Sequence, residues 1–212
     1  MKITLNQIGK RYNRDWIFRN VSLEFQSGDK YAILGPNGSG KSTLLQVIAG
    51  NLIASEGNII YNSEIKKTLS SEAIDTAENI YQHLAICAPY LQLIEEFTLK
   101  EMIDFHTRFK PLAEQLNTEK TIEILALSRA THKQIRHYSS GMKQRVKLGL
   151  AILSNVPLLI LDEPLTNLDD NGKNWYYQLI ETYAAKKTIL VGSNRPDEYA
   201  FTEKQISIND YK

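Results

Sequence analysis

The sequence carries the stretch Gly35-Pro36-Asn37-Gly38-Ser39-Gly40-Lys41-Ser42-Thr43. This stretch matches the phosphate-binding pattern G-x-x-x-x-G-K-[ST] at every fixed position. The apolar run 31–34 before it has the length of a buried strand, and residues 43–49 after it have helical spacing that stops at Gly50. A strand, a glycine-rich loop and a helix in this order predict a phosphate-binding loop (P-loop).

The residue types of this loop explain how it would bind phosphate. Glycines allow a tight turn and let backbone N–H groups approach phosphate oxygens without a Cβ in the way. A helix that begins near Lys41 would point the positive end of its dipole at the anion. We expect the Lys41 ammonium to reach the β- and γ-phosphates and the Ser42 hydroxyl to ligate Mg²⁺. The loop therefore predicts binding of a nucleoside triphosphate.

Composition limits the class of protein. The 212 residues suit one domain, or one domain with a subdomain, and a net charge of +1 gives no strong field for nucleic acid or anionic lipid. Cys87 is the single cysteine, which excludes an intramolecular disulfide and indicates a reducing compartment. We expect Cys87 to be a small buried side chain. Because the sequence has no apolar run of membrane-spanning length and no signal-peptide pattern over 1–20, we expect a cytosolic protein that reaches a membrane only through a partner.

Short apolar segments predict the strands. Residues 2–8 and 21–25 alternate polar and apolar side chains, which predicts a small antiparallel β layer that precedes and flanks the strand before the P-loop. Further strands are expected over 57–61, 84–88, 158–161, 188–192 and 205–208.

Residues 98–128 have helical spacing and few strand signals, which predicts a helical insertion. Thr98 and Glu101 form a capping-box pattern at its start, and a second helix is expected over 118–127. Other helices are expected over 73–81, after a polar cap at 70–72, and over 170–184. The histidines, which we expect to be surface or core residues because none has metal-ligand spacing, are His83, His106, His132 and His137.

Residues 138–145 (Tyr-Ser-Ser-Gly-Met-Lys-Gln-Arg) place two hydroxyls and a glycine directly before a strong helical pattern over 146–153. A helix start of this kind leaves backbone N–H donors free, so it can serve as a plain cap or as an anion site. Local sequence leaves both interpretations open.

Four apolar residues over 158–161 are followed by Asp162 and Glu163, which predicts a buried parallel strand with carboxylates at its C-terminal edge. Ligands bind at that edge in open α/β sheets. We expect Asp162 to partner Mg²⁺, through water or Ser42, and Glu163 to orient or deprotonate the attacking water. A solvated acidic turn is the alternative. Upstream of the P-loop, Tyr12 could stack on an adenine ring or be a half-buried surface tyrosine.

With the P-loop and the acidic pair, residues 138–145 resemble the signature of ATP-binding cassette (ABC) proteins, usually L-S-G-G-Q. Ser139 and Gly141 match it, whereas Tyr138, Ser140 and Met142 depart from the commonest letters. The resemblance covers nearly the whole chain in the correct order, including a segment similar to the D-loop over 166–169. It implies an α/β ABC ATPase fold: a P-loop NTPase core, an antiparallel β layer and a helical insertion. It also implies one domain over 1–212, with a helical subdomain over 93–140.

The resemblance implies roles toward ATP and Mg²⁺ for individual residues. The implied catalytic residues are Lys41, Glu163 and Asn194, and the implied metal ligands are Ser42, Asp162 and Gln92. The implied nucleotide-binding residues are Tyr12, Gly35, Pro36, Asn37, Gly38, Ser39, Gly40, Lys41, Ser42, Thr43, Ser139, Ser140 and Gly141.

Two positions depart from the family pattern. Tyr90 stands where the family usually has a glutamine, with Gln92 two residues further on. Asn194 stands where the family usually has a histidine that contacts the γ-phosphate. Asparagine can donate to a phosphate oxygen, but it cannot titrate or carry charge near neutral pH. Because Glu163 is intact, hydrolysis is still expected.

The resemblance implies that two such domains face each other head to tail, with ATP between the P-loop of one and the signature helix of the other. Binding would close the dimer and hydrolysis would open it. We expect the ATPase subunit of a transport complex at the cytoplasmic face of a membrane. Its expected partners are a second ABC ATPase subunit, in a homodimer, and a separate integral membrane permease, without nucleic acid. The alternatives are a soluble ABC-type ATPase that acts on nucleic acid or ribosomes, and a weakly hydrolysing regulatory ATP-binding module.

Overall fold

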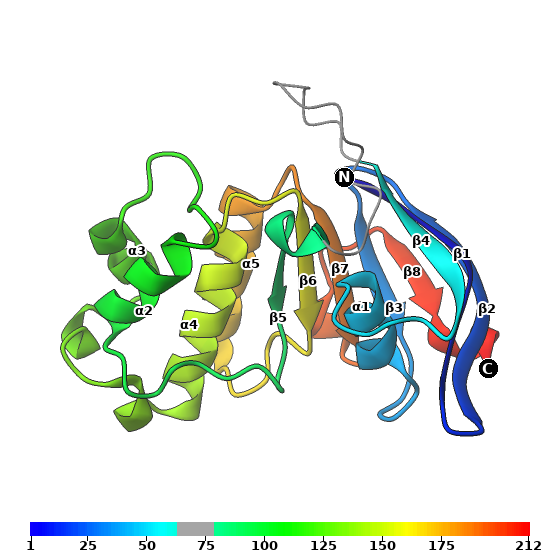
Figure 1. The fold of residues 1–212 in the computed structure, drawn as a ribbon. Helices are drawn as coiled ribbons and strands as arrows, with labels where there is room; N and C mark the ends of the chain where they lie inside the picture. The colour runs from blue at the N-terminus through cyan, green and yellow to red at the C-terminus, as the bar shows by residue number, and fades with distance from the viewer. Residues whose placement is uncertain (63–78) are drawn as a thin grey trace. The chain divides into compact units, whose positions relative to one another are not determined.

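The computed structural model describes residues 1–62 and 79–212, and these divide into two compact units (Figure 1). The first unit comprises Met1–Ile86, Pro157–Asp162 and Lys186–Lys212. The second comprises Cys87–Val156 and Glu163–Ala185. The cap expected at 70–72 and most of the short helix expected over 73–81 lie outside the described residues.

An antiparallel sheet in the first unit has the strand order β2-β1-β4. Its strands are β1 (Lys2–Tyr12), β2 (Asp15–Phe25) and β4 (Glu56–Asn62). Ile3 of β1 pairs with Phe25 of β2 on one side and with Tyr61 of β4 on the other. The expected antiparallel layer is confirmed, and β1 and β2 are longer than their alternating cores because the hairpin continues to the pair Tyr12 and Asp15.

A second sheet in the same unit has the order β5-β6-β7-β3-β8. Its strands are β5 (Leu84–Cys87), β6 (Leu158–Asp162), β7 (Thr188–Ser193), β3 (Lys30–Leu34) and β8 (Lys204–Ser207). The pairs β6–β7, β7–β3 and β3–β8 are parallel. Every residue of β6 and β7 is buried, which explains their continuous apolar character.

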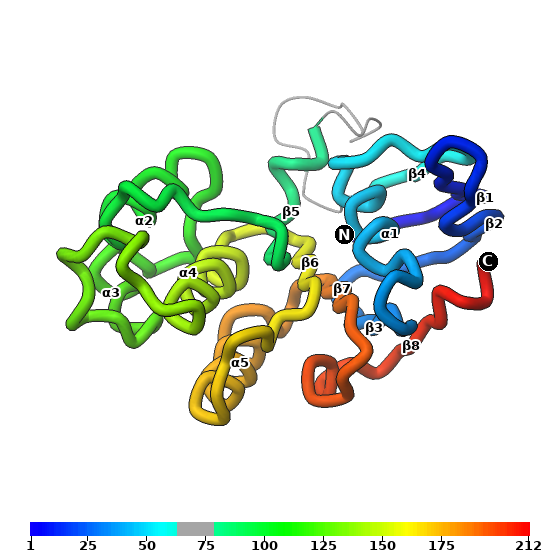
Figure 2. Tube along the Cα trace, turned by 90° about the horizontal axis from the view of Figure 1, so that it is seen from below, coloured from blue at the N-terminus to red at the C-terminus, as the bar shows by residue number. Residues whose placement is uncertain are grey.

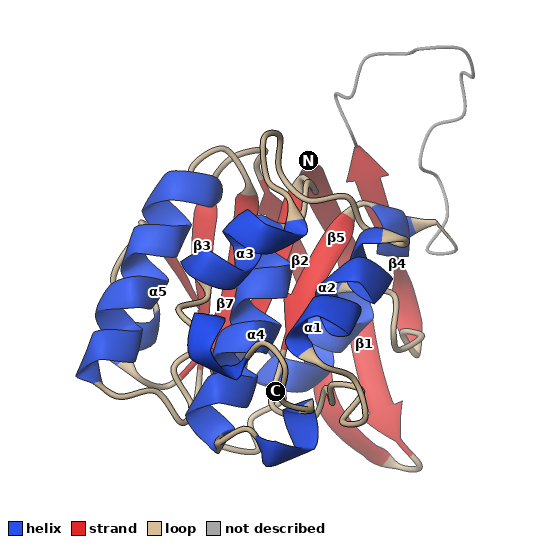
Figure 3. Cartoon of the chain, turned by 90° about the vertical axis from the view of Figure 1, so that its left-hand side faces the viewer, coloured by secondary structure: helices blue, strands red, loops and turns tan. Residues whose placement is uncertain are grey.

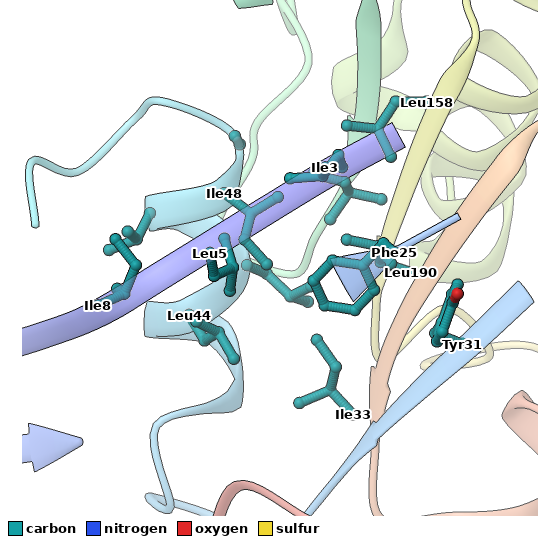
Figure 4. Close-up of a cluster of buried hydrophobic side chains, with 14 of the residues drawn as sticks. Ile3, Leu5, Ile8, Phe25, Tyr31, Ile33, Leu44, Ile48, Leu158 and Leu190 are labelled. Carbon is teal, nitrogen blue, oxygen red and sulfur yellow. The ribbon is translucent and has the colours of Figure 1, made fainter. Parts of the chain in front are cut away.

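Helix α1 (Lys41–Ile48) lies between the two sheets of the first unit (Figures 1 and 2). Figure 4 shows Leu44 and Ile48 of this helix packed with Ile3 and Leu5 of the antiparallel sheet and with Ile33 of the parallel sheet. All five side chains are fully buried, or nearly so. Burying one such side chain contributes about 1.5 to 3 kcal/mol, so the helix after the P-loop is anchored from both sides.

The second unit is built from helices α2 (Leu99–Thr107), α3 (Thr118–Ile124), α4 (Ser140–Leu153) and α5 (Asp170–Tyr183) (Figure 3). The expected capping box begins α2: Thr98 N donates to Glu101 Oε2 at 2.7 Å, and Glu101 N donates to Thr98 Oγ1 at 3.3 Å. The core of this unit includes Leu99, Met102, Ile103, Ile122, Leu125, Ile135, Tyr138, Val146 and Leu150. The subdomain predicted over 93–140 lies inside this wider unit, which also holds all of α4 and α5.

Helix α3 ends at Ile124, earlier than the expected residue 127. Ala126 adopts a left-handed φ of 57°, Ala126 N donates to Glu123 O at 2.9 Å, and Leu127 N donates to Ile122 O at 3.4 Å. These bonds form a Schellman-type end, which usually requires glycine. Local sequence did not signal it because alanine favours helix continuation.

Five 3₁₀ turns complete the described elements: η1 (Ile80–Gln82), η2 (Ser128–Ala130), η3 (Ile135–His137), η4 (Pro196–Glu198) and η5 (Ile208–Tyr211). Cys87 is buried as expected. Among the described residues, no helix is both long enough and apolar enough to span a membrane.

His106 sits near the end of α2 in a half-buried position. Its Nε2 lies 2.8 Å from Ser154 Oγ, and the Ser154 hydroxyl donates to Leu150 O at 2.6 Å. Since that hydroxyl hydrogen is used, His106 Nε2 donates to the serine oxygen, which fixes the neutral tautomer. Burial, together with the positive charge of Lys110, lowers the pKa of His106 to about 4.

This lowered pKa predicts a pH-dependent stability. Between about pH 4 and pH 6.5 the unfolded chain binds a proton at His106 that the folded chain excludes, so the free energy of unfolding falls as the pH falls through this range. In His106→Gln, which keeps an amide donor but cannot titrate, urea unfolding at pH 5 and pH 7 should show a smaller pH dependence than wild type. His132→Gln, at an exposed histidine of the same unit, is the control. An unchanged pH dependence in His106→Gln would contradict the assignment.

Candidate functional site

The topology of the first unit brings three predicted site segments to one edge of the parallel sheet. Strands β6, β7 and β3 are neighbours, with Asp162 opposite Gly192 and Leu34 opposite Ser193. Because the strands are parallel, their carboxyl ends lie side by side. The P-loop follows β3, Asp162 closes β6 and Asn194 follows β7. This edge is where ligands bind in open α/β sheets.

The P-loop depends on two of its glycines for its shape. Gly40 has a left-handed φ of 101°, and a Cβ at this position would lie 2.6 Å from Ile17 Cγ2 of β2. A Cβ at Gly35 would lie 2.5 Å from Ser39 Oγ and 2.7 Å from Ile208 Cγ2. Side chains at these positions would therefore push the loop away from β2 and η5. The antiparallel sheet thus contributes directly to the conformation of the P-loop.

Lys41 is only 4% exposed, although it carries a charge. Its Nζ donates to Gly35 O at 2.9 Å and to Pro36 O at 3.1 Å. The carbonyls of the loop thereby solvate the ammonium, which would otherwise be costly to bury. Within the described residues the buried Ser39 Oγ has no hydrogen-bond partner, so the loop also presents an unused polar atom. Both features suit a loop that receives an anionic ligand.

The first hydrogen bond of α1 runs from Leu44 N to Gly40 O at 2.9 Å. The N–H groups of Lys41, Ser42 and Thr43 precede it, so the helix itself does not use them. They add backbone donors and the positive end of the helix dipole to the loop.

Asn194 contacts the P-loop directly: its Nδ2 donates to Asn37 Oδ1 at 3.1 Å. Both side chains are exposed, so the pair lies at the rim of the site. The Ser193 hydroxyl donates to the buried carboxylate of Glu198. This hydrogen bond holds together the two ends of the turn that contains Asn194. The sequence analysis named both Asn194 and Asn37 as site residues but did not predict the contact between them.

Gly192 is a residue of this site that sequence reasoning missed. A Cβ there would lie 2.7 Å from Leu45 Cδ1 of α1 and 3.1 Å from Asp162 Oδ1. The missing side chain lets α1 and the buried Asp162 carboxylate both approach β7 closely. A glycine inside a strand pattern often marks such an approach, and this was the available signal.

Tyr12 lies at the end of β1 and is 48% exposed. The Lys10 ammonium lies 5.2 Å from the ring centroid. The next strand, β2, contacts the P-loop at Gly40, so the hairpin that carries Tyr12 is part of the surroundings of the loop. The stacking role predicted for Tyr12 stays a prediction.

The predicted signature segment starts α4 in the second unit. Ser139 is the N-cap, and its Oγ accepts from Met142 N at 3.2 Å. Ser140 is exposed and Gly141 is half-buried. Tyr138, which stands where the family has leucine, is buried in the core of this unit, and its hydroxyl donates to Ala130 O at 2.8 Å. The larger side chain is therefore accommodated with its polar atom satisfied.

Glu163 and Gln92 also belong to the second unit. Gln92 is exposed on the segment after β5, and Tyr90 is 43% exposed. Glu163 is half-buried and has a left-handed φ of 47°, which costs a non-glycine residue about 1 to 2 kcal/mol. Strained backbone of this kind is common at functional sites. The roles predicted for Ser139, Ser140, Gly141, Gln92 and Glu163 stay predictions.

A family model decides the classification. The model of the ABC transporter matches residues 18–166 of the chain, from β2 past β6. The chain belongs to the ABC transporter family. The predicted ABC ATPase fold is confirmed, and the chain is the nucleotide-binding ATPase domain of this family.

Two relatives and one solved structure show the extent of the likeness. The chain is 27% identical to the ABC transporter ATP-binding protein YcbN of Bacillus subtilis over 194 residues, 91% of this chain and 61% of the relative. It is 31% identical to the energy-coupling factor transporter ATP-binding protein EcfA1 of Thermotoga maritima over 188 residues, 86% of this chain and 68% of that protein. A dimeric bacterial ABC transporter cassette shares the fold, with a TM-score of 0.78 and 22% identity over 97% of this chain and 94% of that one.

The buried ammonium of Lys41 generates a prediction for this ABC domain. Lys41→Ala removes the charge that the loop holds in place, and a hydrogen bond to a charged group contributes about 1.5 to 3 kcal/mol. We expect affinity for ATP, measured by displacement of a fluorescent ATP analogue, to fall about ten- to a hundredfold. Lys30→Ala, which removes the same charge at the start of β3, should keep wild-type affinity. Tight binding by Lys41→Ala would refute the role of the loop.

Proposed function

We propose that this ABC domain binds ATP with Mg²⁺, closes on a second copy of itself, hydrolyses the ATP and thereby powers a separate integral membrane permease. The observation that carries the proposal is the buried Lys41 ammonium, held by the carbonyls of Gly35 and Pro36. An arriving triphosphate offers this ammonium stronger acceptors than carbonyl oxygens.

Mg²⁺ fits the chemistry of the residues at this edge of the sheet. Ser42 and Asp162 offer hydroxyl and carboxylate oxygens, which are the ligands Mg²⁺ prefers. In the described parts of the chain, no group of three or more His, Cys, Asp or Glu side chains could hold a metal ion. A cation here would therefore take phosphate oxygens as further ligands, as Mg²⁺ does in nucleotide sites. When bound, it would neutralise charge on the phosphates, and Gln92 is the further proposed ligand.

Hydrolysis is assigned to Glu163 and Asn194. Glu163 directly follows Asp162 in the chain, and its carboxylate would accept a proton from the attacking water. Asn194 already points its amide at Asn37 of the P-loop, and the same N–H group would donate to the γ-phosphate. Lys41 would stabilise the charge that develops on the transferred phosphoryl group.

Dimer closure is supported by the open start of α4. With Ser139 as the cap and both Ser139 and Ser140 exposed, the first turn of this helix can offer backbone donors to the ATP held by a second copy. A solved cassette with the same fold is described as dimeric. Closure would then depend on ATP, because the phosphates bridge the P-loop of one copy and α4 of the other.

The names of two relatives support the proposal that the domain powers a membrane permease. YcbN is named as an ABC transporter ATP-binding protein, and EcfA1 as an energy-coupling factor transporter ATP-binding protein. The net charge of +1 gives no comparable support for nucleic acid as a partner. We place the domain at the cytoplasmic face of the membrane, bound to its permease.

A second candidate function is a regulatory module that binds ATP and turns it over weakly. Asn194 favours it, since an amide cannot carry the charge that a protonated histidine would place beside the γ-phosphate. The two candidates differ in the rate of hydrolysis and not in the nucleotide site.

Glu163→Gln separates binding from hydrolysis. The amide keeps the shape of the side chain but cannot accept a proton, so we expect hydrolysis to fall at least about a hundredfold. ATP should then hold a dimer long enough for size exclusion with light scattering to detect it. Glu181→Gln, on the exposed side of α5, should hydrolyse ATP like wild type. A Glu163→Gln protein that stays monomeric in saturating ATP and Mg²⁺ would argue against the sandwich.

The permease partner is tested by purification from membranes. A tagged Glu163→Gln chain, expressed in its native host and extracted in mild detergent with ATP, should bring down one multi-span membrane protein at a fixed stoichiometry. Lys41→Ala, which should not close on ATP, is the matched comparison. Recovery of ribosomes or nucleic acid in place of a membrane protein would support the soluble alternative.

A further inference from the structure

Residues 163–167 of the second unit form a constrained turn directly after the sheet. Glu163 and Asn167 have left-handed φ angles of 47° and 65°. Within the turn, Thr166 N donates to Glu163 O at 3.2 Å, and the Leu165 side chain between them is buried. Asparagine tolerates this conformation, but glutamate has no such preference. Something outside the turn must therefore hold Glu163 in place.

Helix α4 supplies that support at two points. The Gln144 side chain is only 3% exposed, and its Nε2 donates to Pro164 O at 2.7 Å. One turn earlier on the same helix, Gly141 lies so close to the far end of the turn that a Cβ there would be 3.0 Å from Asn167 O. Both ends of the turn thus rest on the first two turns of α4. A short bond to a buried backbone carbonyl leaves the carbonyl little freedom to move.

We propose that Gln144 is a positioning residue for hydrolysis: its buried amide holds the Pro164 carbonyl and thereby fixes the backbone of Glu163. Pro164 follows Glu163 directly, and its ring fixes its φ angle. A displacement of Pro164 would therefore be passed to the peptide bond it shares with Glu163 and to the backbone that carries the Glu163 side chain. A general base works only when its carboxylate stays within hydrogen-bond reach of the reacting proton. Gln144 therefore acts through Glu163 and does not itself touch the nucleotide.

Helix α4 would then have two functions. This inference rests on the proposed function. The exposed start of the helix would meet the ATP held by the partner copy, while Gln144 on its second turn holds the base that serves its own copy. Any shift of α4 when it engages the partner's ATP would reach Glu163 through one hydrogen bond. Within one copy, Gln144 thus links the start of α4 to the turn that carries Glu163.

Gln144→Met tests the inference, because methionine has a similar length but cannot donate to the carbonyl. We expect kcat for ATP to fall at least about tenfold, with KM changed less than about twofold. As in Glu163→Gln, a dimer held by ATP should accumulate on size exclusion, since binding is intact and hydrolysis is slow. If thermal unfolding shows that Gln144→Met does not fold, Gln144→Glu, whose carboxylate only accepts, replaces it with the same expected result.

Trp175→Phe is the matched control. It deletes a bond of the same kind and length in the same unit, from Trp175 Nε1 to Ile124 O at 2.7 Å, which links α5 to α3 and not to the turn. This variant should keep the wild-type kcat. The inference is overturned if Gln144→Met keeps the wild-type kcat, if it loses the ATP-dependent dimer together with kcat, or if Trp175→Phe loses kcat equally. A wild-type protein without ATP turnover would contradict the proposed function, which is a separate result.

Discussion

The burial of α1 between two sheets is the constraint on which the nucleotide site depends. The helix has no side-chain cap, and its eight residues are too few to be stable alone in water. Packing of its apolar side chains against Ile3 and Leu5 on one side and Ile33 on the other keeps it formed. This packing fixes the position of the unused N–H groups at its start, and with them the P-loop. The antiparallel sheet is therefore part of the site, although it supplies only Tyr12 among the predicted contacts.

The same constraint explains two glycines and one buried charge. Because Gly40 has no Cβ, the loop can lie close to β2. Because Gly192 has none, Leu45 of α1 can pack against β7 beside Asp162. The loop that results encloses Lys41 and must solvate its ammonium with its own carbonyls. Among the described residues, the Lys41 ammonium is held by carbonyl oxygens and not by a carboxylate, so a phosphate can take their place without breaking an ion pair.

Much of this architecture could be predicted from sequence, since it is encoded locally. The P-loop pattern, the capping box at Thr98 and the apolar run before Asp162 each lie within a few residues, and the structure contains the elements that they predict. Contacts between distant segments left no local trace. The bonds from Asn194 to Asn37 and from Gln144 to Pro164 depend on how strands and helices pack, and the strand order of the parallel sheet does too. The end of α3 was missed for a different reason: Ala126, just after the helix, adopts a left-handed conformation that alanine disfavours.

The position of Cys87 in the second unit makes its thiol a reporter of local opening. Its sulfur lies 3.9 Å from Gln144 Nε2, buried beside the amide that holds the turn after Glu163. Because it is the single cysteine of the chain, a thiol reagent can label nothing else. Its modification rate therefore measures how often this part of the protein opens, as hydrogen exchange does for a backbone amide. Local unfolding around α4 can therefore be followed through the modification of Cys87, without introducing a probe.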